Sequence, residues 1–172
     1  MTDHKGSTTR RGVIIGAAGG LVAASAHAAP QALSMKDLNK EADVACLYHC
    51  DYGEPARFAQ TLNNISNHYS VYGADPFGLQ LVIVAHSVAV KFFMSTLEGT
   101  PWKDETIDPK TFERVADLAK NGLKVHLCEI TFQRLKLDKG KVHDAPFISF
   151  VPSGVATVAA LQSKGFAYMK IG

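Results

Sequence analysis

The stretch Gly122-Leu-Lys-Val-His-Leu-Cys128 predicts a short buried strand over 123–127 that ends beside a thiol. The polar residues that follow, 129–138, predict a helix. A strand followed directly by a helix is typical of α/β proteins, which place their chemistry where the strands end. A lone cysteine at a strand end is more often a small buried hydrophobic residue than a nucleophile, so this position makes Cys128 a candidate without deciding its role.

Four other segments are apolar enough to be strands, and helical patterns lie between them. One helix is bounded by the start signal Asp108-Pro109 and the stop signal Asn121-Gly122. Because parallel neighbours need a crossover connection, the alternation predicts a three-layer α/β/α domain with a mostly parallel central sheet of about five strands. The other predicted strands are 43–49, 79–85, 147–151 and 166–171, and the other predicted helices are 54–69, 87–97 and 153–163.

The beginning of the chain has the pattern of a secretion signal. Thr9-Arg10-Arg11 leads into a weakly apolar run over 13–26, and Ala26-His27-Ala28 has the small-x-small pattern of a cleavage site. A membrane anchor needs roughly 20 apolar residues, which this glycine-containing run does not reach. We therefore expect a twin-arginine signal peptide over 1–28, a tether over 29–42 and an α/β domain over 43–172. The mature chain is expected in the periplasm without stable membrane insertion.

The charge balance argues against nucleic acid as a partner. The full sequence has 18 Lys and Arg against 16 Asp and Glu. Removal of residues 1–28 would leave equal numbers of both, and an uncharged domain has no basic face for a phosphate backbone. The sequence also has no glycine-rich phosphate loop, C-x-x-C, C-x-x-C-H or H-E-x-x-H motif. No hydrolase or dehydrogenase motif is present, and no cofactor is expected.

Polar and nucleophilic residues follow the predicted strands. Parallel strands end at one edge of a sheet, so these residues are expected to converge. Cys128 and Cys50 are candidate thiols, and His49 and His86 are candidate bases or ligands, although each histidine alone could be a hydrogen-bonded strand-end residue. A helix start beside Cys128 would favour the thiolate, and Ser153 is either an anion-binding residue or only a helix cap. Asp51, Ser87, Ser153 and Gly154 complete the predicted anion or substrate site.

The cysteine count also bears on the site. The chain has 3 cysteines, so at least one lacks an intrachain disulfide partner. Cys46 and Cys50 fall on one predicted strand, where four residues span roughly 13 Å, beyond the limit of about 7 Å for a disulfide. A pair of Cys50 with Cys128 is geometrically conceivable if their strands are neighbours.

Several of these segments together resemble the DsrE/DsrF-like family of small sulfur-relay proteins. The resemblance covers 43–171 and is carried by the first strand with His49, by Val84-Ala85-His86, by the Gly122 to Cys128 strand, and by Val151-Pro-Ser-Gly-Val155. It implies a compact α/β/α fold and assembly into trimers or hexamers. In some members a cysteine after such a strand carries sulfane sulfur as a persulfide. Where many relatives have glycine after the second-strand histidine, this chain has Ser87.

Three functions follow as hypotheses. The first is sulfane-sulfur handling by a carrier or transferase-like protein, with Cys128 as persulfide carrier, Cys50 as a candidate resolving thiol, and a sulfur donor or acceptor protein as partner. The second is a copper- or zinc-binding module whose ligands are Cys50, Cys128, His49 and His86. The third is a non-catalytic oligomeric interaction protein. An apolar content of 47%, including aromatic residues near predicted edges, also favours a homo-oligomer; these residues are Phe92, Phe93 and Phe132.

Overall fold

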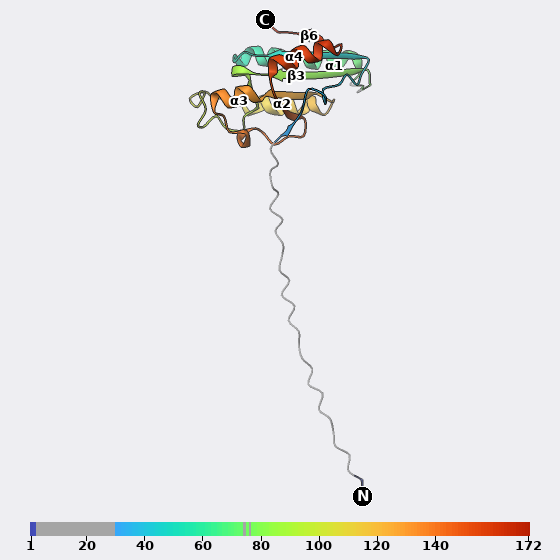
Figure 1. The fold of residues 1–172 in the computed structure, drawn as a ribbon, viewed down its shortest axis with the longest axis vertical. Coiled ribbons are helices and arrows are strands. Elements are labelled where there is room, and N and C mark those ends of the chain that lie inside the picture. Colours follow the sequence, from blue (N-terminus) through green and yellow to red (C-terminus); the bar gives the residue numbers. More distant parts are fainter. Residues whose placement is uncertain (3–29, 74, 76) are drawn as a thin grey trace.

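The domain is built around a single parallel sheet flanked by helices on both faces (Figure 1). The computed structural model describes residues 1–2, 30–73, 75 and 77–172, so the predicted signal peptide lies outside the described residues. Within them, six strands are ordered β1-β5-β4-β3-β2-β6, and every neighbouring pair is parallel. The strands are β1 Gln31–Ala32, β2 Val44–Cys50, β3 Leu79–Ala85, β4 Lys124–Cys128, β5 Ile148–Val151 and β6 Ala167–Met169.

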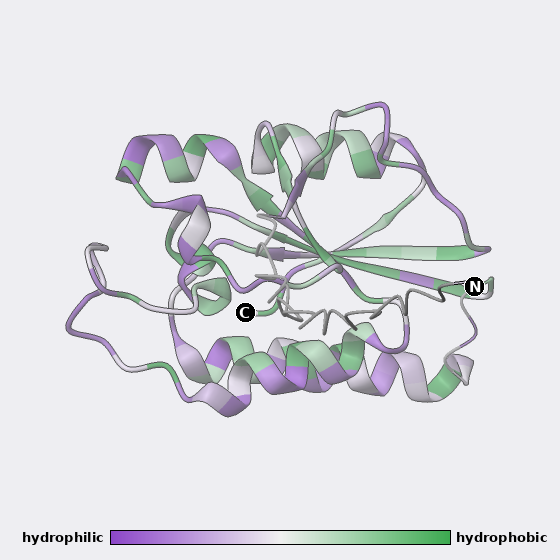
Figure 2. Ribbon diagram, turned by 90° about the horizontal axis from the view of Figure 1, so that it is seen from below, coloured by the Kyte–Doolittle hydropathy of each residue, from purple (hydrophilic) through white to green (hydrophobic). Residues whose placement is uncertain are grey.

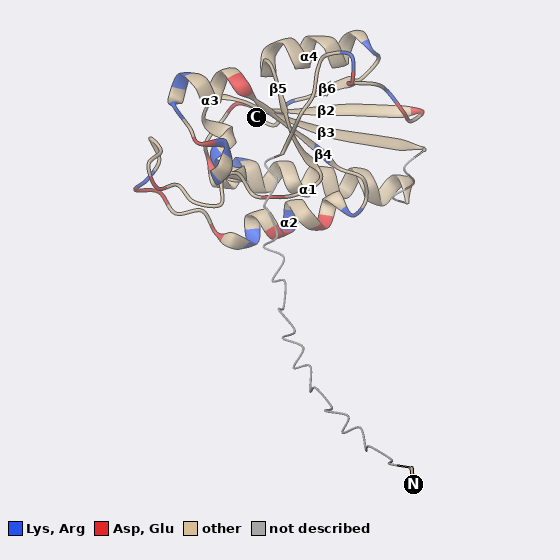
Figure 3. Ribbon diagram, turned by 60° about the horizontal axis from the view of Figure 1, so that its bottom comes forward, with Lys and Arg blue, Asp and Glu red and all other residues tan. Residues whose placement is uncertain are grey.

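The helices divide unequally between the two faces. Figure 3 shows α4 on one side of the sheet and α1 and α2 on the other. The strands contain much green in Figure 2, as expected for strands covered on both faces. The helices are α1 Pro55–Tyr72, α2 Pro109–Ala119, α3 Glu129–Leu135 and α4 Gly154–Ser163, with 3-10 segments η1 Ser87–Phe93 and η2 Lys139–Lys141.

Alternation along the strands gives two separate cores. The larger core lies on the α1 and α2 face and takes Cys46, Tyr48 and Cys50 from β2. The smaller core lies under α4 and takes Ala45 and Leu47 from the same strand. Because successive side chains of a strand point to opposite faces, neighbouring residues at a strand end serve different faces of the sheet. This rule decides which candidate residues can meet.

The segment predicted as a tether over 29–42 is part of the sheet and core. β1 pairs with β5, and the backbone N–H of Leu33 donates to Phe150 O at 2.8 Å. The Leu38 side chain is 3% exposed and belongs to the core under α4. Residues 31–38 of the predicted tether therefore pack with the α/β domain. A strand of two residues has no alternation of its own from which it could be predicted.

Two predicted helices are shorter than expected. The predicted helix over 87–97 is the 3-10 segment η1, which ends because Met94 forms an antiparallel bridge with Val142 that makes the backbone extended. The predicted helix over 129–138 ends at Leu135, where Lys136 adopts a left-handed conformation with φ 52°.

The aromatic residues that favoured an oligomer lie inside the domain. Phe92 and Phe93 are 2% and 0% exposed, and both pack against Phe58 of α1, with ring centroids at 4.3 Å and 5.6 Å. Phe132 is 2% exposed and packs edge-on against Phe150. These side chains stabilise the fold and are not available for a subunit contact. In the described part of the chain, no helix is both long and apolar enough to cross a membrane.

Candidate functional site

The carboxyl edge of the sheet brings Cys128 and His86 together beneath the start of α4. Cys128 ends β4 beside Val151 of β5, which belongs to the core under α4, so the thiol lies on the α4 face. A methyl group on Gly154 would lie 2.8 Å from the His86 Cβ and 3.2 Å from the Cys128 Cβ. Only a glycine allows the first residue of α4 to approach both side chains so closely.

A cavity of about 450 Å³ opens beside this contact. Cys128 lines it, although its side chain is only 5% exposed. Arg134 gives the cavity a cationic group, and Ser153 lies at its rim, where its hydroxyl caps α4 by accepting from the Ala156 N–H at 3.3 Å. The remaining lining residues are His86, Ser87, Ile130, Thr131, Leu135 and Val155. The cavity therefore combines a thiol, an imidazole and a cation.

Ser87 holds an unusual backbone conformation at this site. Its φ is 55°, in the left-handed region that favours glycine, and its N–H donates to the Thr131 hydroxyl at 2.9 Å. A glycine would adopt this φ without strain. Ser87 shapes the turn between β3 and η1, and it is exposed beside the cavity.

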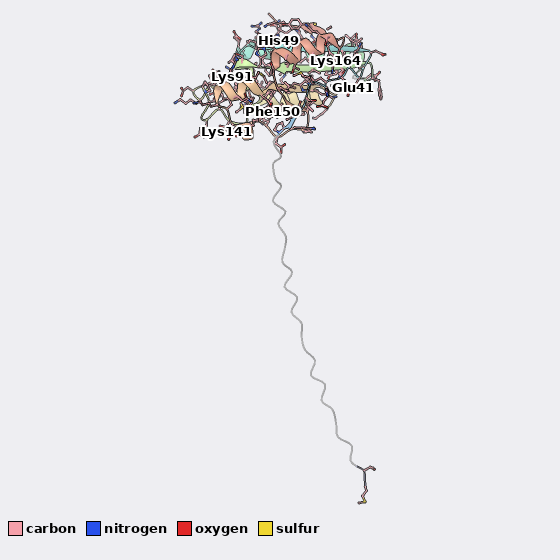
Figure 4. The ribbon with its side chains drawn as sticks, viewed as in Figure 1. Glu41, His49, Lys91, Lys141, Phe150 and Lys164 are labelled. Carbon is pink, nitrogen blue, oxygen red and sulfur yellow. The ribbon has the colours of Figure 1, made fainter. Side chains whose placement is uncertain are left out.

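His49 and His86 lie in direct contact on the same face. Their Nε2 atoms are 2.7 Å apart, so when both rings are neutral one nitrogen donates and the other accepts. The Nδ1 atom of His49 is 2.7 Å from the Tyr168 hydroxyl of β6. Figure 4 labels His49 and Glu41, which lie apart because His49 is near the carboxyl end of β2 and Glu41 precedes its amino end. Burial lowers the pKa of both histidines, so the neutral pair is favoured at neutral pH.

Asp51 extends this contact toward solvent. Its Oδ2 atom is 4.0 Å from the His49 Nε2 and accepts from the Lys170 ammonium at 2.6 Å. Partial burial alone would raise the pKa of the Asp51 carboxyl, but the hydrogen bond from the Lys170 ammonium and the positive charge of that group help to lower it. Asp51 is therefore a carboxylate at neutral pH, and it faces the histidine pair.

Cys50 does not join Cys128. It belongs to the core on the α1 and α2 face, is 0% exposed, and its sulfur is 3.4 Å from the Tyr52 hydroxyl. Burial raises the pKa of this thiol to about 12. β3 separates β2 from β4, and all three cysteines are free. The predicted metal site of four residues and the predicted Cys50–Cys128 pair both require the two thiols to lie on one face of the sheet. Cys50 and Cys128 lie on opposite faces, so the structure brings neither set together.

Sequence reasoning missed Tyr168 and Lys170, which lie close to His49 and Asp51. Tyr168 lies on β6 and Lys170 directly follows it, and β6 pairs with β2 although more than a hundred residues separate the two strands in the chain. The position of β6 beside β2 depends on strand order, which hydropathy does not provide. The sequence was sufficient to predict that His49 and Cys50 point to opposite faces of the sheet, because adjacent residues of a strand do so.

A larger cavity, of about 680 Å³, lies near the amino end of β4. Gly122, Lys124 and the buried His126 line it, and no cysteine does. The His126 Nδ1 is 2.7 Å from the Ser149 hydroxyl, and burial lowers the pKa of His126 to about 4. We place the candidate site at the smaller cavity because the thiol and the histidine contact lie there.

The fold and the site define a small parallel α/β protein with a thiol at the carboxyl edge of its sheet. Residues 25–171 match the DsrE/DsrF-like family, and the chain belongs to that family. This family suggests a role of the sulfur-relay type.

Among solved structures, a protein of unknown function from Methanobacterium thermoautotrophicum is similar, with a TM-score of 0.58 and 20% identity. The match covers 74% of this chain and 99% of that chain, and it supports the fold alone. No curated protein sequence matches this chain.

Proposed function

We propose that this DsrE/DsrF-like protein carries sulfane sulfur as a persulfide on Cys128. The observation that carries the proposal is the position of this thiol in a cavity with His86 and Arg134, beneath the first residue of α4. Cys46 and Cys50 do not line that cavity. A sulfur carrier needs a thiol that a small donor can reach and a polar surrounding that stabilises anions.

The transfer step is a thiol–disulfide type of exchange. The Cys128 thiolate attacks the outer sulfur of a donor persulfide or polysulfide, the donor S–S bond breaks, and the shortened donor leaves as a thiolate. A new S–S bond forms on Cys128, so no external oxidant is required. His86 is proposed to accept the thiol proton, because burial keeps its imidazole neutral. Arg134 and the positive end of the α4 dipole, beside Ser153, would attract the anionic donor.

The test is intact mass spectrometry after incubation with polysulfide. The wild-type chain should gain about 32 daltons, one sulfur atom, and lose it again with reductant. Cys128→Ser should not gain this mass, whereas Cys46→Ser and Cys50→Ser should load as the wild type does. Loading of Cys128→Ser at the wild-type level would refute the assignment of the carrier.

We also propose export by the twin-arginine pathway and assembly into a homo-oligomer. The proposal of export is supported by the Arg10-Arg11 pair and the Ala26-His27-Ala28 pattern. Assembly is supported by the family resemblance and by β6, where Tyr168 and Met169 are 42% and 37% exposed. A sulfur donor or acceptor protein would then meet the chain outside the cytoplasm. Light scattering on the purified chain tests assembly, and a monomer at micromolar concentration would contradict it.

A further inference from the structure

The contact among His49, His86 and Asp51 places three ligand atoms around one point. The two Nε2 atoms are 2.7 Å apart, and all three ligand atoms lie within 4.8 Å of one another. They come from two neighbouring strand ends, because His49 and Asp51 flank the last residue of β2 and His86 follows β3. All three side chains are half-buried, so they are held in place and still reachable from solvent.

We propose that His49, His86 and Asp51 bind a divalent transition-metal ion, with Zn²⁺ as the ion that fits them best. Two imidazole nitrogens and one carboxylate oxygen are donors that suit zinc. Three protein ligands leave a fourth position open, as in zinc sites that bind water or a substrate. This ligand set contains no cysteine, so it differs from a thiolate site and does not depend on the proposed sulfur chemistry.

The geometry needs only small side-chain movements to accept the ion. Zinc–nitrogen bonds of about 2.0–2.1 Å at a tetrahedral angle place two nitrogens about 3.3 Å apart. The Nε2 atoms, at 2.7 Å, would separate slightly, and the Asp51 oxygen, at 4.0 Å from the His49 Nε2, would move closer. Both shifts lie within the reach of half-buried side chains on a fixed backbone.

The surroundings of His49 resemble the outer shell of a metal site. Histidine ligands commonly donate their second ring N–H to an oxygen, which fixes the ring and its tautomer. Here the Tyr168 hydroxyl lies 2.7 Å from the His49 Nδ1, while the Nε2 faces His86. The hydroxyl can accept that N–H when the Nε2 lone pair binds an ion.

Lys170 acts as a competitor at the same place. Its ammonium contacts the Asp51 Oδ2 at 2.6 Å, and its side chain is 35% exposed, so it can turn into solvent. In the proposed site the metal ion replaces the Lys170 ammonium as the cation that contacts Asp51. This exchange gives the proposal a test of opposite sign, because removal of the lysine should tighten metal binding.

Isothermal titration of the chelator-treated full chain with Zn²⁺ tests the site. We expect one Zn²⁺ per chain, and affinity at least about tenfold weaker in His49→Gln, His86→Gln and Asp51→Asn. His68→Gln is the matched control, since His68 lies on α1 outside the cluster, and it should bind as the wild type does. Circular dichroism checks that each variant folds. Failure of the wild type to bind, or full binding by the three ligand variants, would overturn the proposal.

Three further variants show whether the three side chains bind a metal ion or only contact one another, and whether the thiol takes part. Lys170→Ala should bind Zn²⁺ several-fold more tightly, and unchanged or weaker binding would contradict the exchange. Tyr168→Phe should bind about tenfold less tightly. Cys128→Ser should lose sulfur loading and keep its Zn²⁺ affinity, so the two proposals fail independently. A thiolate-to-metal charge-transfer band in the Co²⁺-substituted chain would overturn the cysteine-free ligand set.

Discussion

The two faces of the sheet should give Cys50 and Cys128 very different reactivity toward a small alkylating reagent. Burial raises the pKa of Cys50 from an ordinary value of 9.0 to about 12. At pH 8 this lowers its thiolate population from about one in ten to about one in ten thousand, a factor of about a thousand. Because Cys50 is also 0% exposed, the reagent reaches it only after local opening. Cys128 is 5% exposed and lines a cavity, so we expect the reagent to reach it from that side.

The assay is timed alkylation with iodoacetamide at pH 8, followed by intact mass and peptide mapping. The native chain should take up one label, on Cys128, and labelling of Cys50 should be at least about a hundredfold slower. In denaturant all three cysteines should react, which shows that the reagent is not limiting. Cys128→Ser should remain unlabelled on the same timescale. Labelling of Cys50 in the native chain within tenfold of Cys128 would refute the reasoning from burial and face.

Four other predictions concern stability and export. Because burial lowers the pKa of His126 from 6.5 to about 4, the neutral form is favoured in the fold, and stability should be lost as pH falls from about 6.5 to 4. The loss is about 3 kcal/mol, and urea unfolding of His126→Gln should show a flatter pH dependence. Gly154→Ala should destabilise the domain by about 1–3 kcal/mol in the same assay, because its methyl group would overlap His86. Ser87→Gly should unfold at or slightly above the wild-type urea concentration, and Ser87→Val clearly below it, because of the left-handed φ. Replacement of Arg10 and Arg11 by lysine should leave the precursor in the cytoplasm on fractionation, and normal export would contradict a twin-arginine signal.

Hydropathy and turn chemistry predicted most of the layers of this fold. The strand over 79–85 has the predicted bounds, and the helix that follows Pro109 starts where predicted. The apolar run of β3 is long and unbroken, and the signals Asp108-Pro109 are local, so both could be interpreted without tertiary information. The two-residue β1 and the 3-10 segment η1 could not, because partners distant in the chain, β5 and Val142, determine their backbone.

The sequence predicted the location of the candidate site better than the contacts within it. Convergence at the carboxyl edge follows from parallel strands, and it placed His49, His86 and Cys128 correctly near one edge. The adjacency of His49 to Cys50 implied that only one of them could face α4. Tyr168 and Lys170 lie close to His49 and Asp51 because β6 pairs with β2. The order of strands in the sheet results from packing, and no local sequence pattern predicts it.

The position of Gly154 links the two proposed activities of this edge. The first turn of α4 packs on the Cβ atoms of both His86 and Cys128, so the helix holds the imidazole and the thiol at a fixed separation. On its other side the His86 ring contacts His49, which connects it to Asp51. His86 is therefore shared by the thiol cavity and the three-ligand cluster. A metal ion that binds its Nε2 would remove the base proposed for Cys128, so occupation of the cluster by Zn²⁺ should slow sulfur loading without touching the thiol.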